Sequence, residues 1–350
     1  MNRADAIIVG GGIAGLTAAR VMLRGGFRPV VLDKGRGPGG RLATLRLEME
    51  AGEAVFDYGA QQVSARSPHF QKQMDRWIEA GVTSEWCRGL PAPGEAEPDD
   101  RTVRYRGTKG LRGLAVDLAR DVELHQQTRV TSVSRSRDGW AADTADGRRV
   151  EGRALLITTP VPQALDLLEA SGVSLSPAHG SMLSSITYDP CIAALALTER
   201  RAGLPDPGAL RLAGEPLVWA ADNHRKGISP LAGAVTLHAG PRTSERLWTA
   251  GDDETAGELL AAAEPWIGSS PRLVTVHRWR YSRPVSKAGI PFAGLGTSPP
   301  MALAGDGFGD SRVEGAWNSG RLAGGWLRAQ LGRPDAQRPN LTSSFPEDGR

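Results

Sequence analysis

Cysteine is nearly missing from this 350-residue sequence: only Cys87 and Cys191 occur, and they lie far apart. They form no CxxC or CxxH pair, so the sequence predicts neither a disulfide framework nor a zinc site, and no other metal site. We interpret both as small buried apolar residues. Free thiols are typical of a reducing cytoplasm, which is the compartment that we expect.

An excess of charge and long apolar runs are lacking as well. The chain has 42 Lys and Arg against 39 Asp and Glu, and no basic stretch alternates with aromatic residues. This balance argues against nucleic acid as a partner. No segment reaches the roughly 18 apolar residues of a membrane span, and no signal peptide precedes the first apolar run. We expect a soluble cytoplasmic protein, and its oligomeric state is left open.

Periodicity and turn residues predict the order of elements. The predicted helices cover 14–25, 68–88, 110–121 and 254–264, and a last one begins near 313. The predicted strands cover 6–9 and 29–33, and 122–158 reads as strands and hairpins with a turn at Asp146-Gly147. Residues 35–62 contain glycine-rich turns, 89–101 form a surface loop, and 333–350 are expected to be a disordered tail.

The first glycine motif is Gly10-x-Gly12-x-x-Gly15, between an apolar strand and a helix, with Asp33 at the end of the next strand. Gly10 permits a tight turn, Gly12 lets a pyrophosphate approach the backbone, and Gly15 lets the helix pack on the strand. The helix start, at Ile13 and Ala14, offers N–H groups to phosphates. Asp33 can accept from both ribose hydroxyls. The pattern predicts a dinucleotide site, of FAD or NAD.

Two further motifs favour FAD. Gly39-Gly40-Arg41 follows Asp33 and Lys34, and Arg41 would bring a fixed cation to the pyrophosphate. Near the other end of the chain, Gly305-Asp306-Gly307 precedes a helix that starts near Val313. Asp306 is placed to bind the ribityl or pyrophosphate portion. The helix N-terminus would point at the flavin edge where negative charge develops on reduction, and small residues such as Ala316 let the helix lie close beneath the cofactor.

These motifs resemble the renalase-like branch of the flavin amine oxidase superfamily, over about residues 5–330. The resemblance also rests on "DKGRGPGGRLAT" at 33–44, "FDYGAQQVSAR" at 56–66, "YRGTKGLRGLAVDLA" at 105–119, "HRWRYSRP" at 277–284 and "AGDGFGDSRVEGAWNSG" at 304–320. Gln62 and Val63 depart from the aromatic pair that the family usually has there. Residues 302–332 contain no cysteine for a covalent flavin bond, so we expect FAD to be held non-covalently.

The resemblance implies a fold, a set of contacts and a reaction. The fold is α/β (α+β overall), with a Rossmann-type, glutathione-reductase-2-like FAD-binding domain and an inserted mixed-sheet substrate domain. The FAD-binding domain is expected to cover 1–67, 105–165 and 272–332. The substrate domain is expected to cover 68–104 and 166–271. The implied cofactor contacts are Gly10, Gly12, Ile13, Ala14, Gly15, Asp33, Lys34, Gly40, Arg41, Tyr58, Gly59, Ala60, Gln61, Val130, Thr159, Pro160, Gly305, Asp306, Arg312, Val313, Glu314 and Ala316.

The implied reaction is hydride transfer from a small reduced substrate, a dihydro isomer of NAD(P), to flavin N5, with O₂ as acceptor giving hydrogen peroxide. The candidate substrate contacts are Tyr188, Asn223, His238, Trp279 and Tyr281. Two alternatives stay open. One is an oxidase or dehydrogenase of amines or of lipid or carotenoid-like substrates on the same fold, and the other is a flavin-binding protein without turnover. NAD as the bound dinucleotide is opposed by Gly39-Gly40-Arg41 together with Asp306.

Overall fold

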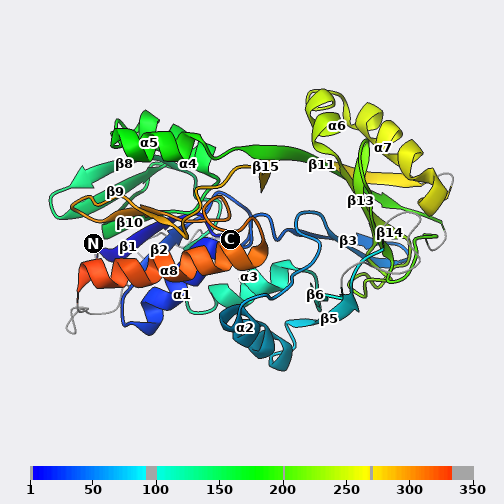
Figure 1. Ribbon diagram of the computed structural model, residues 1–350, viewed down its shortest axis with the longest axis horizontal. Coiled ribbons are helices and arrows are strands. Elements are labelled where there is room, and N and C mark those ends of the chain that lie inside the picture. The colour runs from blue at the N-terminus through cyan, green and yellow to red at the C-terminus, as the bar shows by residue number, and fades with distance from the viewer. Residues whose placement is uncertain (1–2, 92–100, 200–201, 269–270, 333–350) are drawn as a thin grey trace.

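The computed structural model describes residues 3–91, 101–199, 202–268 and 271–332. The predicted tail at 333–350 and most of the predicted loop at 89–101 lie outside these residues. The described chain forms two large β-sheets, one at the left and one at the right of Figure 1, and two separate hairpins. None of the helices in these ranges is both long and apolar enough to cross a membrane.

The larger sheet has eight strands, in the order β16-β17-β10-β1-β2-β7, with β9 and then β8 added beside β10. Five strands run parallel: β1 (Ala4–Val9), β2 (Pro29–Leu32), β7 (Glu123–His125), β10 (Arg149–Ile157) and β17 (Met301–Leu303). The others pair antiparallel: β8 (Val130–Ser136), β9 (Gly139–Thr144) and β16 (Ala293–Gly294). All residues of β1 are buried, as a parallel strand covered on both faces requires.

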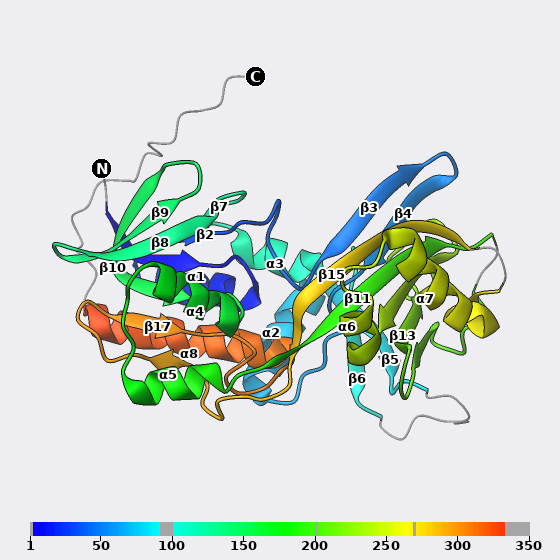
Figure 2. The same ribbon diagram turned by 90° about the horizontal axis from the view of Figure 1, so that it is seen from above.

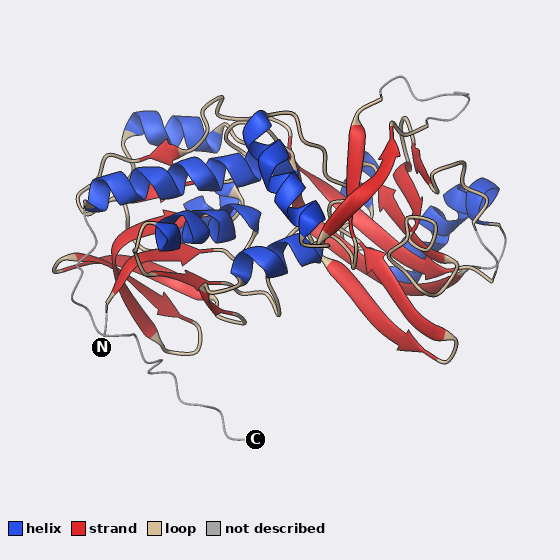
Figure 3. Ribbon diagram, turned by 90° about the horizontal axis from the view of Figure 1, so that it is seen from below, coloured by secondary structure: helices blue, strands red, loops and turns tan. Residues whose placement is uncertain are grey.

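Helices cover both faces of this sheet (Figure 3). Ala6 and Ile8 of β1 pack towards α1 (Ile13–Arg24) and α8 (Val313–Leu331). Ile7 and Val9 pack towards α4 (Val161–Ala170) and α5 (Pro177–Ser184) on the opposite face. The alternation follows from the two-residue period of a strand. The first and last helices of the described chain thus lie side by side, and their strands complete one layered unit.

The second sheet has five antiparallel strands, in the order β12-β13-β14-β11-β15. They are β11 (Tyr188–Leu197), β12 (Ala209–Arg211), β13 (Leu217–Asp222), β14 (Ala234–Ala239) and β15 (Arg272–Pro284). Helices α6 (Pro241–Arg246) and α7 (Asp252–Ile267) lie over one face, where they share an apolar core with β11, β13 and β14. The long strands β11 and β15 run side by side from this sheet towards the larger one (Figure 2).

The remaining elements are two hairpins that pack on the five-stranded sheet and two helices that share a core with α1 and α8. They are the hairpin β3 (Thr44–Met49) and β4 (Gly52–Asp57), the hairpin β5 (Thr83–Arg88) and β6 (Val103–Gly107), and helices α2 (Pro68–Glu79) and α3 (Arg112–Ala119). Ala54 and Phe56 of β4 share a core with Leu195 of β11, so the β3–β4 hairpin covers the second face of the five-stranded sheet. The end of β4 is thereby placed at the junction of the two sheets.

The structure corrects three expectations. The helix predicted over 68–88 ends at Glu79, because Gly81 adopts a left-handed φ of 67° and the chain turns back into strand β5. Residues 35–62 contain the β3–β4 hairpin in addition to turns. Cys191 is buried as expected, but Cys87 is only half-buried. The domain ranges stay a prediction: α5 lies in the range 166–271 yet packs on the larger sheet, and β15 lies in the range 272–332 yet pairs with β11.

Candidate cofactor and substrate site

The glycine cradle is our name for residues 10–15, 39–40 and 305, which lie at the carboxyl ends of β1 and β17 and in the turn after β2. A Cβ on Gly15 would stand 2.0 Å from the backbone oxygen of Gly10, so only glycine lets α1 begin this close to β1. Gly39 donates to the Gly11 carbonyl at 2.9 Å, which brings the second glycine turn against the first. A Cβ on Gly12 would meet nothing within 4 Å. That opening is where the motif predicts a pyrophosphate.

Asp33 follows β2 directly and lies beside the cradle. Its carboxylate accepts from the backbone N–H groups of Gly11 and Gly35, the latter at 2.6 Å. These bonds fix the acid next to the turn, where the motif predicts the adenosine ribose. Lys34 instead points to the surface, where its Nζ lies 3.5 Å from the side-chain oxygen of Gln163.

Arg41 and Asp306, from opposite ends of the chain, form a two-bonded ion pair with N···O distances of 2.7 and 2.6 Å. The same guanidinium donates to the carbonyls of Tyr281 and Ser282 in β15. Burial opposes the charge on Arg41, but the carboxylate of Asp306 prevails and raises the pKa of the guanidinium. Arg41 therefore links the cradle to the long strand of the second sheet.

The start of α8 carries the other predicted contacts near Asp306. No side chain caps the helix at Arg312, which is exposed. Its first-turn residue Glu314 is buried and accepts from the backbone N–H groups of Arg66 and Ser67, both at 2.8 Å. Glu314 thus holds the chain that follows the "DYGAQ" segment. A Cβ on Gly320 would lie 2.0 Å from the Ala14 carbonyl, so α8 crosses α1 backbone to backbone.

The "DYGAQ" segment, residues 57–61, runs from the end of β4 across Arg41. Ala60 donates to the Arg41 carbonyl at 2.8 Å, and a Cβ on Gly59 would stand 2.1 Å from that oxygen. Gln61 is 8% exposed, and its amide nitrogen donates to the Asp57 and Gly59 carbonyls. Its amide oxygen Oε1 is buried without a hydrogen-bond partner. The structure therefore brings two predicted cofactor segments into direct contact.

Three aromatic side chains, Tyr58, His277 and Trp279, form what we call the aromatic cluster. Tyr58 and Trp279 stack with ring centres 5.5 Å apart at 23°, and His277 meets both rings edge-on. The indole Nε1 of Trp279 donates to the Tyr58 carbonyl at 2.8 Å. Burial raises the pKa of the Tyr58 phenol and lowers that of His277, so both groups are neutral near pH 7. The cluster offers flat, uncharged surfaces.

His238 of β14 lies next to the aromatic cluster, with Nε2 3.2 Å from the same Tyr58 carbonyl. Because a carbonyl only accepts, Nε2 carries the proton and Nδ1 is left as an acceptor. Burial lowers the pKa of His238 to about 4, and the charge of Lys226 acts in the same direction. A neutral imidazole and the free oxygen of Gln61 are thus two hydrogen-bond acceptors on neighbouring side chains, which approach to 3.4 Å through their Nε2 atoms.

Tyr188 and Tyr281 form a second aromatic pair beside Arg41, with ring centres 5.8 Å apart. The Tyr188 hydroxyl accepts from the Val161 N–H at 3.4 Å, and burial raises its pKa to about 12. It also occupies the space beside Gly307, where a Cβ would stand 2.7 Å away.

Nearby, Thr159 has a buried hydroxyl without a partner, and Pro160 precedes α4. Val130 lies farther along the sheet edge, opposite Thr144.

Sequence reasoning missed a fully buried ion pair. The Lys226 ammonium donates to the Asp57 carboxylate at 2.7 Å, and both side chains are fully buried. Burial lowers the pKa of Lys226, and the carboxylate opposes this. The predicted substrate contact Asn223 belongs to this network: its side chain bonds Asp57 N, the Ala234 carbonyl and the Thr236 hydroxyl, and none of it reaches solvent. The sequence separation of 169 residues hid the pair.

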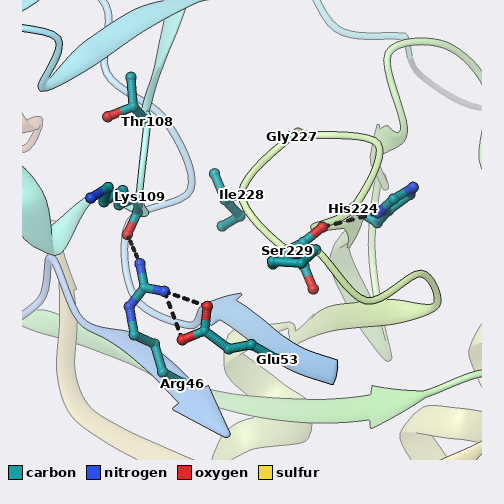
Figure 4. Close-up of a pocket in the computed structure, with 9 residues that line it drawn as sticks. Arg46, Glu53, Thr108, Lys109, His224, Gly227, Ile228 and Ser229 are labelled. Carbon is teal, nitrogen blue, oxygen red and sulfur yellow. Dashed lines mark hydrogen bonds and ion pairs between the residues drawn. The ribbon is translucent and has the colours of Figure 1, made fainter. Parts of the chain in front are cut away.

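A surface pocket of about 540 Å³ lies elsewhere, between the β3–β4 hairpin and the turn at 224–230 (Figure 4). Arg46 and Glu53 pair across the hairpin at 2.9 Å, and His224 bonds the carbonyl of Ser229. None of its lining residues is a predicted cofactor or substrate contact. The glycine cradle and the aromatic cluster therefore stay the candidate site.

A flavin dinucleotide fits the residues present. Gly12 and Gly305 face open space, and no side chain caps the N-terminus of α1 or α8. The buried hydroxyl of Thr159 lacks a partner, which a cofactor with ring N–H and hydroxyl groups supplies. Backbone N–H groups, a fixed arginine and acids at both ends of the cradle match the polar parts of such a molecule.

Known proteins agree with this arrangement. Residues 87–324 match the family of flavin-containing amine oxidoreductases, and residues 8–77 match an NAD(P)-binding Rossmann-like domain. Protein FLOWERING LOCUS D of Arabidopsis thaliana is 41% identical over 58 residues, which are 17% of this chain and only 7% of that protein.

Solved structures show the same fold over almost the whole chain. Putrescine oxidase bound to putrescine superimposes with a TM-score of 0.66 over 94% of this chain and 99% of its own, at 13% identity. A cofactor-binding variant of it reaches 0.68 at 14% identity, over 94% of this chain and 99% of that one. A protein of Exiguobacterium sp. assigned as a protoporphyrinogen oxidase also reaches 0.68 at 13% identity, over 94% and 100%. These likenesses establish a mixed α/β fold with a Rossmann-like domain.

Proposed function

This chain belongs to the flavin-containing amine oxidoreductase family, and from that premise we propose which substrate its site takes. It is an FAD-dependent oxidoreductase. We propose that the glycine cradle, Asp33, Arg41 and Asp306 hold the FAD without a covalent bond. When bound, FAD would supply a two-electron acceptor for the hydride that the substrate loses; O₂, with one further proton from solvent, would then take up the electrons and leave as hydrogen peroxide.

The substrate that we propose is a 2- or 6-dihydro isomer of NAD(P), as in renalase-like enzymes, whose reduced nicotinamide ring is neutral although its pyrophosphate is charged. The observation that supports this proposal most is that, among the described residues around the aromatic cluster, each carboxylate discussed above has a partner. Asp57 is paired with Lys226, Asp306 with Arg41, and Glu314 with two backbone N–H groups. The polar groups that remain are neutral acceptors, His238 Nδ1 and Gln61 Oε1, which suit the N–H₂ of a primary carboxamide.

Within this proposal each side chain has one task. The Tyr58 and Trp279 rings lie against the dihydronicotinamide on the side away from the flavin and exclude water there. His238 and Gln61 orient the carboxamide, which fixes the rotation of the ring. No proton needs to leave a dihydronicotinamide on hydride transfer. The neutral state of His238 therefore serves recognition rather than base catalysis.

An amine is the second candidate, because family membership and the stacked Tyr58–Trp279 pair both support it. Aromatic faces attract an ammonium group. The site then has to take the amine in its neutral form or use ring faces alone, since its carboxylates are paired. Lipid or carotenoid-like substrates and a non-catalytic role are supported by no particular contact.

Anaerobic mixing of the purified yellow protein with candidate reductants tests the proposal. The panel holds 2- and 6-dihydro isomers of NAD(P), ordinary NADH and NADPH, putrescine and a monoamine, and the readout is bleaching of oxidised-flavin absorbance. We expect rapid bleaching by the dihydro isomers alone, reversed by air with peroxide release. Bleaching by amines or by ordinary NAD(P)H would overturn the substrate assignment. Tyr58→Leu, which keeps the carbonyl but removes the ring, should slow the reaction. Arg46→Gln in the surface pocket, which contains no predicted substrate contact, should not.

A further inference from the structure

The buried pair of Lys226 and Asp57 lies at the start of the "DYGAQ" segment, of which Asp57 is the first residue. Lys226 comes from the turn between β13 and β14, and Asp57 is the last residue of β4, so the pair joins the five-stranded sheet to the hairpin. The other carboxylate oxygen accepts from the Thr44 hydroxyl at 2.6 Å and from the Leu111 N–H at 2.9 Å. The ammonium lies 5.5 Å from the centre of the Trp86 ring. Three separate segments therefore meet at one carboxylate.

The backbone of Asp57 is held as firmly as its side chain. Its N–H donates to Asn223 Oδ1 at 3.3 Å, and its carbonyl accepts from Thr236 Oγ1 at 3.0 Å and from Gln61 Nε2 at 2.7 Å. The next carbonyl along the chain, that of Tyr58, accepts from both Trp279 and His238. A shift of residue 57 thus moves the Tyr58 carbonyl. That carbonyl orients the Trp279 indole and determines which nitrogen of His238 carries the proton.

We infer that Lys226 and Asp57 are positioning residues: their buried ion pair fixes residues 57–61 so that Trp279, His238 and Gln61 face the substrate in one arrangement. An ion pair without solvent access is costly to form and gives little net stability, but it tolerates only one geometry. Such a pair is suited to setting a register between two sheets. The inference rests on the proposed site but not on the identity of its substrate.

Lys226→Met tests the inference, because it removes the ammonium and keeps the length of the side chain. We expect FAD to stay bound, since the glycine cradle, Asp33, Arg41 and Asp306 are untouched. We expect the ¹⁵N signals of the Trp279 indole and the His238 imidazole to shift, and flavin reduction to slow by about 100-fold, the scale of a 1 Å misplacement. Arg46→Gln breaks an exposed ion pair in the same hairpin and should change neither signal. The NMR signals need no substrate, so they report on positioning even if the proposed substrate is wrong.

Wild-type signals and a wild-type reduction rate in folded Lys226→Met protein would overturn the inference. If Lys226→Met does not fold, the double variant Asp57→Asn with Lys226→Met is measured in its place, because it removes both charges. Recovery of fold, signals and rate in this double variant would show that the pair only compensates charge, and would equally overturn the inference. Recovery of the fold with displaced signals and slow reduction would support it. If neither the single nor the double variant folds, Lys226→Arg takes their place, because it keeps the charge but moves it. Displaced Trp279 and His238 signals in Lys226→Arg would support the inference, and unchanged signals would overturn it.

Discussion

The glycine cradle and the aromatic cluster sit on either side of Arg41 but are built in different ways. In the cradle, backbone groups form the surface, and glycines at positions 12 and 305 leave space that a side chain would fill. At the aromatic cluster, Trp279 of β15 and the neighbouring His238 of β14 converge on one backbone carbonyl, that of Tyr58. The first region depends on the absence of side chains and the second on their exact direction.

The difference affects how each region responds to change. A parallel sheet with a buried strand and two flanking helices fixes the cradle, and short motifs encode it. The cluster needs the hairpin β3–β4, the turn at Lys226 and the strand β15 in register at once. We therefore expect substitutions in the cradle to alter stability and FAD affinity, and substitutions near the cluster to alter rate and pH dependence.

Arg41→Gln should have the largest effect, because Arg41 belongs to both regions. It leaves the carboxylate of Asp306, 10% exposed, without its cation, and it releases the carbonyls of Tyr281 and Ser282. We expect the free energy of unfolding to fall by about 3 kcal/mol. We also expect FAD affinity and the rate of flavin reduction to fall together. Urea unfolding of the apoprotein and titration with FAD measure these changes.

Arg41→Lys is the matched control, because it keeps the charge but cannot make two parallel bonds. It should recover part of the stability and little of the contact with β15. If the apoprotein of Arg41→Gln is as stable as wild type, the ion pair of Arg41 with Asp306 does not join the two regions.

Gly15→Ala should have the next largest effect and should act on the cradle alone. The new Cβ would lie 2.0 Å from the Gly10 carbonyl, and backbone has to move to admit it. We expect a loss of about 2 kcal/mol in stability, measured by urea unfolding of the apoprotein. Gly12→Ala is the contrast, since its Cβ meets nothing within 4 Å. It should leave apoprotein stability unchanged and weaken FAD binding. Equal stability losses in both variants would contradict the assignment of space at Gly12 to the cofactor.

The cradle could be predicted from the sequence because its information is local. The strand–turn–helix at the start of the chain, the acid at position 33 and the helix that begins at Val313 are each found where the spacing predicted them. Which residues contact the cofactor stays a prediction. The hairpin β3–β4 was missed although Leu45, Leu47 and Met49 alternate with polar residues, because the glycines around them favoured turns. The extension of helix α2 to residue 88 ignored Gly81 as a stop.

The substrate side was predictable only in part, because it depends on contacts across the chain. Trp279 and His238 stood out as aromatic and titratable residues on strands, but nothing nearby in sequence shows that both bond the Tyr58 carbonyl. Asn223 was expected in the pocket, and the structure shows that its amide is fully bonded behind it. The pairing of Lys226 with Asp57 requires the register of two hairpins and a sheet. No local pattern encodes that register.

His238 should give the aromatic region a pH signature that the cradle lacks. Its pKa of about 4 in the folded protein lies below the usual 6.5, so the unfolded chain binds more protons between these values. Stability is then lost as pH falls through this window, by about 1 kcal/mol between pH 6.5 and 5.5. The measurement is urea unfolding of wild type and His238→Gln at several pH values. The variant should show a shallower fall, and identical pH curves would mean that His238 is not held neutral.

Gly325→Ala should have the smallest effect on stability. Compared with Gly324→Ala, it separates helix packing from helix propensity in α8, the helix that packs on α1. Gly324 and Gly325 are neighbours in α8, so alanine brings each the same propensity gain of about 1 kcal/mol. A Cβ on Gly325 meets nothing within 4 Å, whereas one on Gly324 would stand 2.8 Å from the Ala18 carbonyl of α1. Gly325→Ala should therefore raise the melting temperature, and Gly324→Ala should lower it. Because both changes share one helix, the difference between them measures the close crossing of α1 and α8 alone. A stabilising Gly324→Ala would show that the two helices can separate without loss, and that the cradle does not depend on their contact.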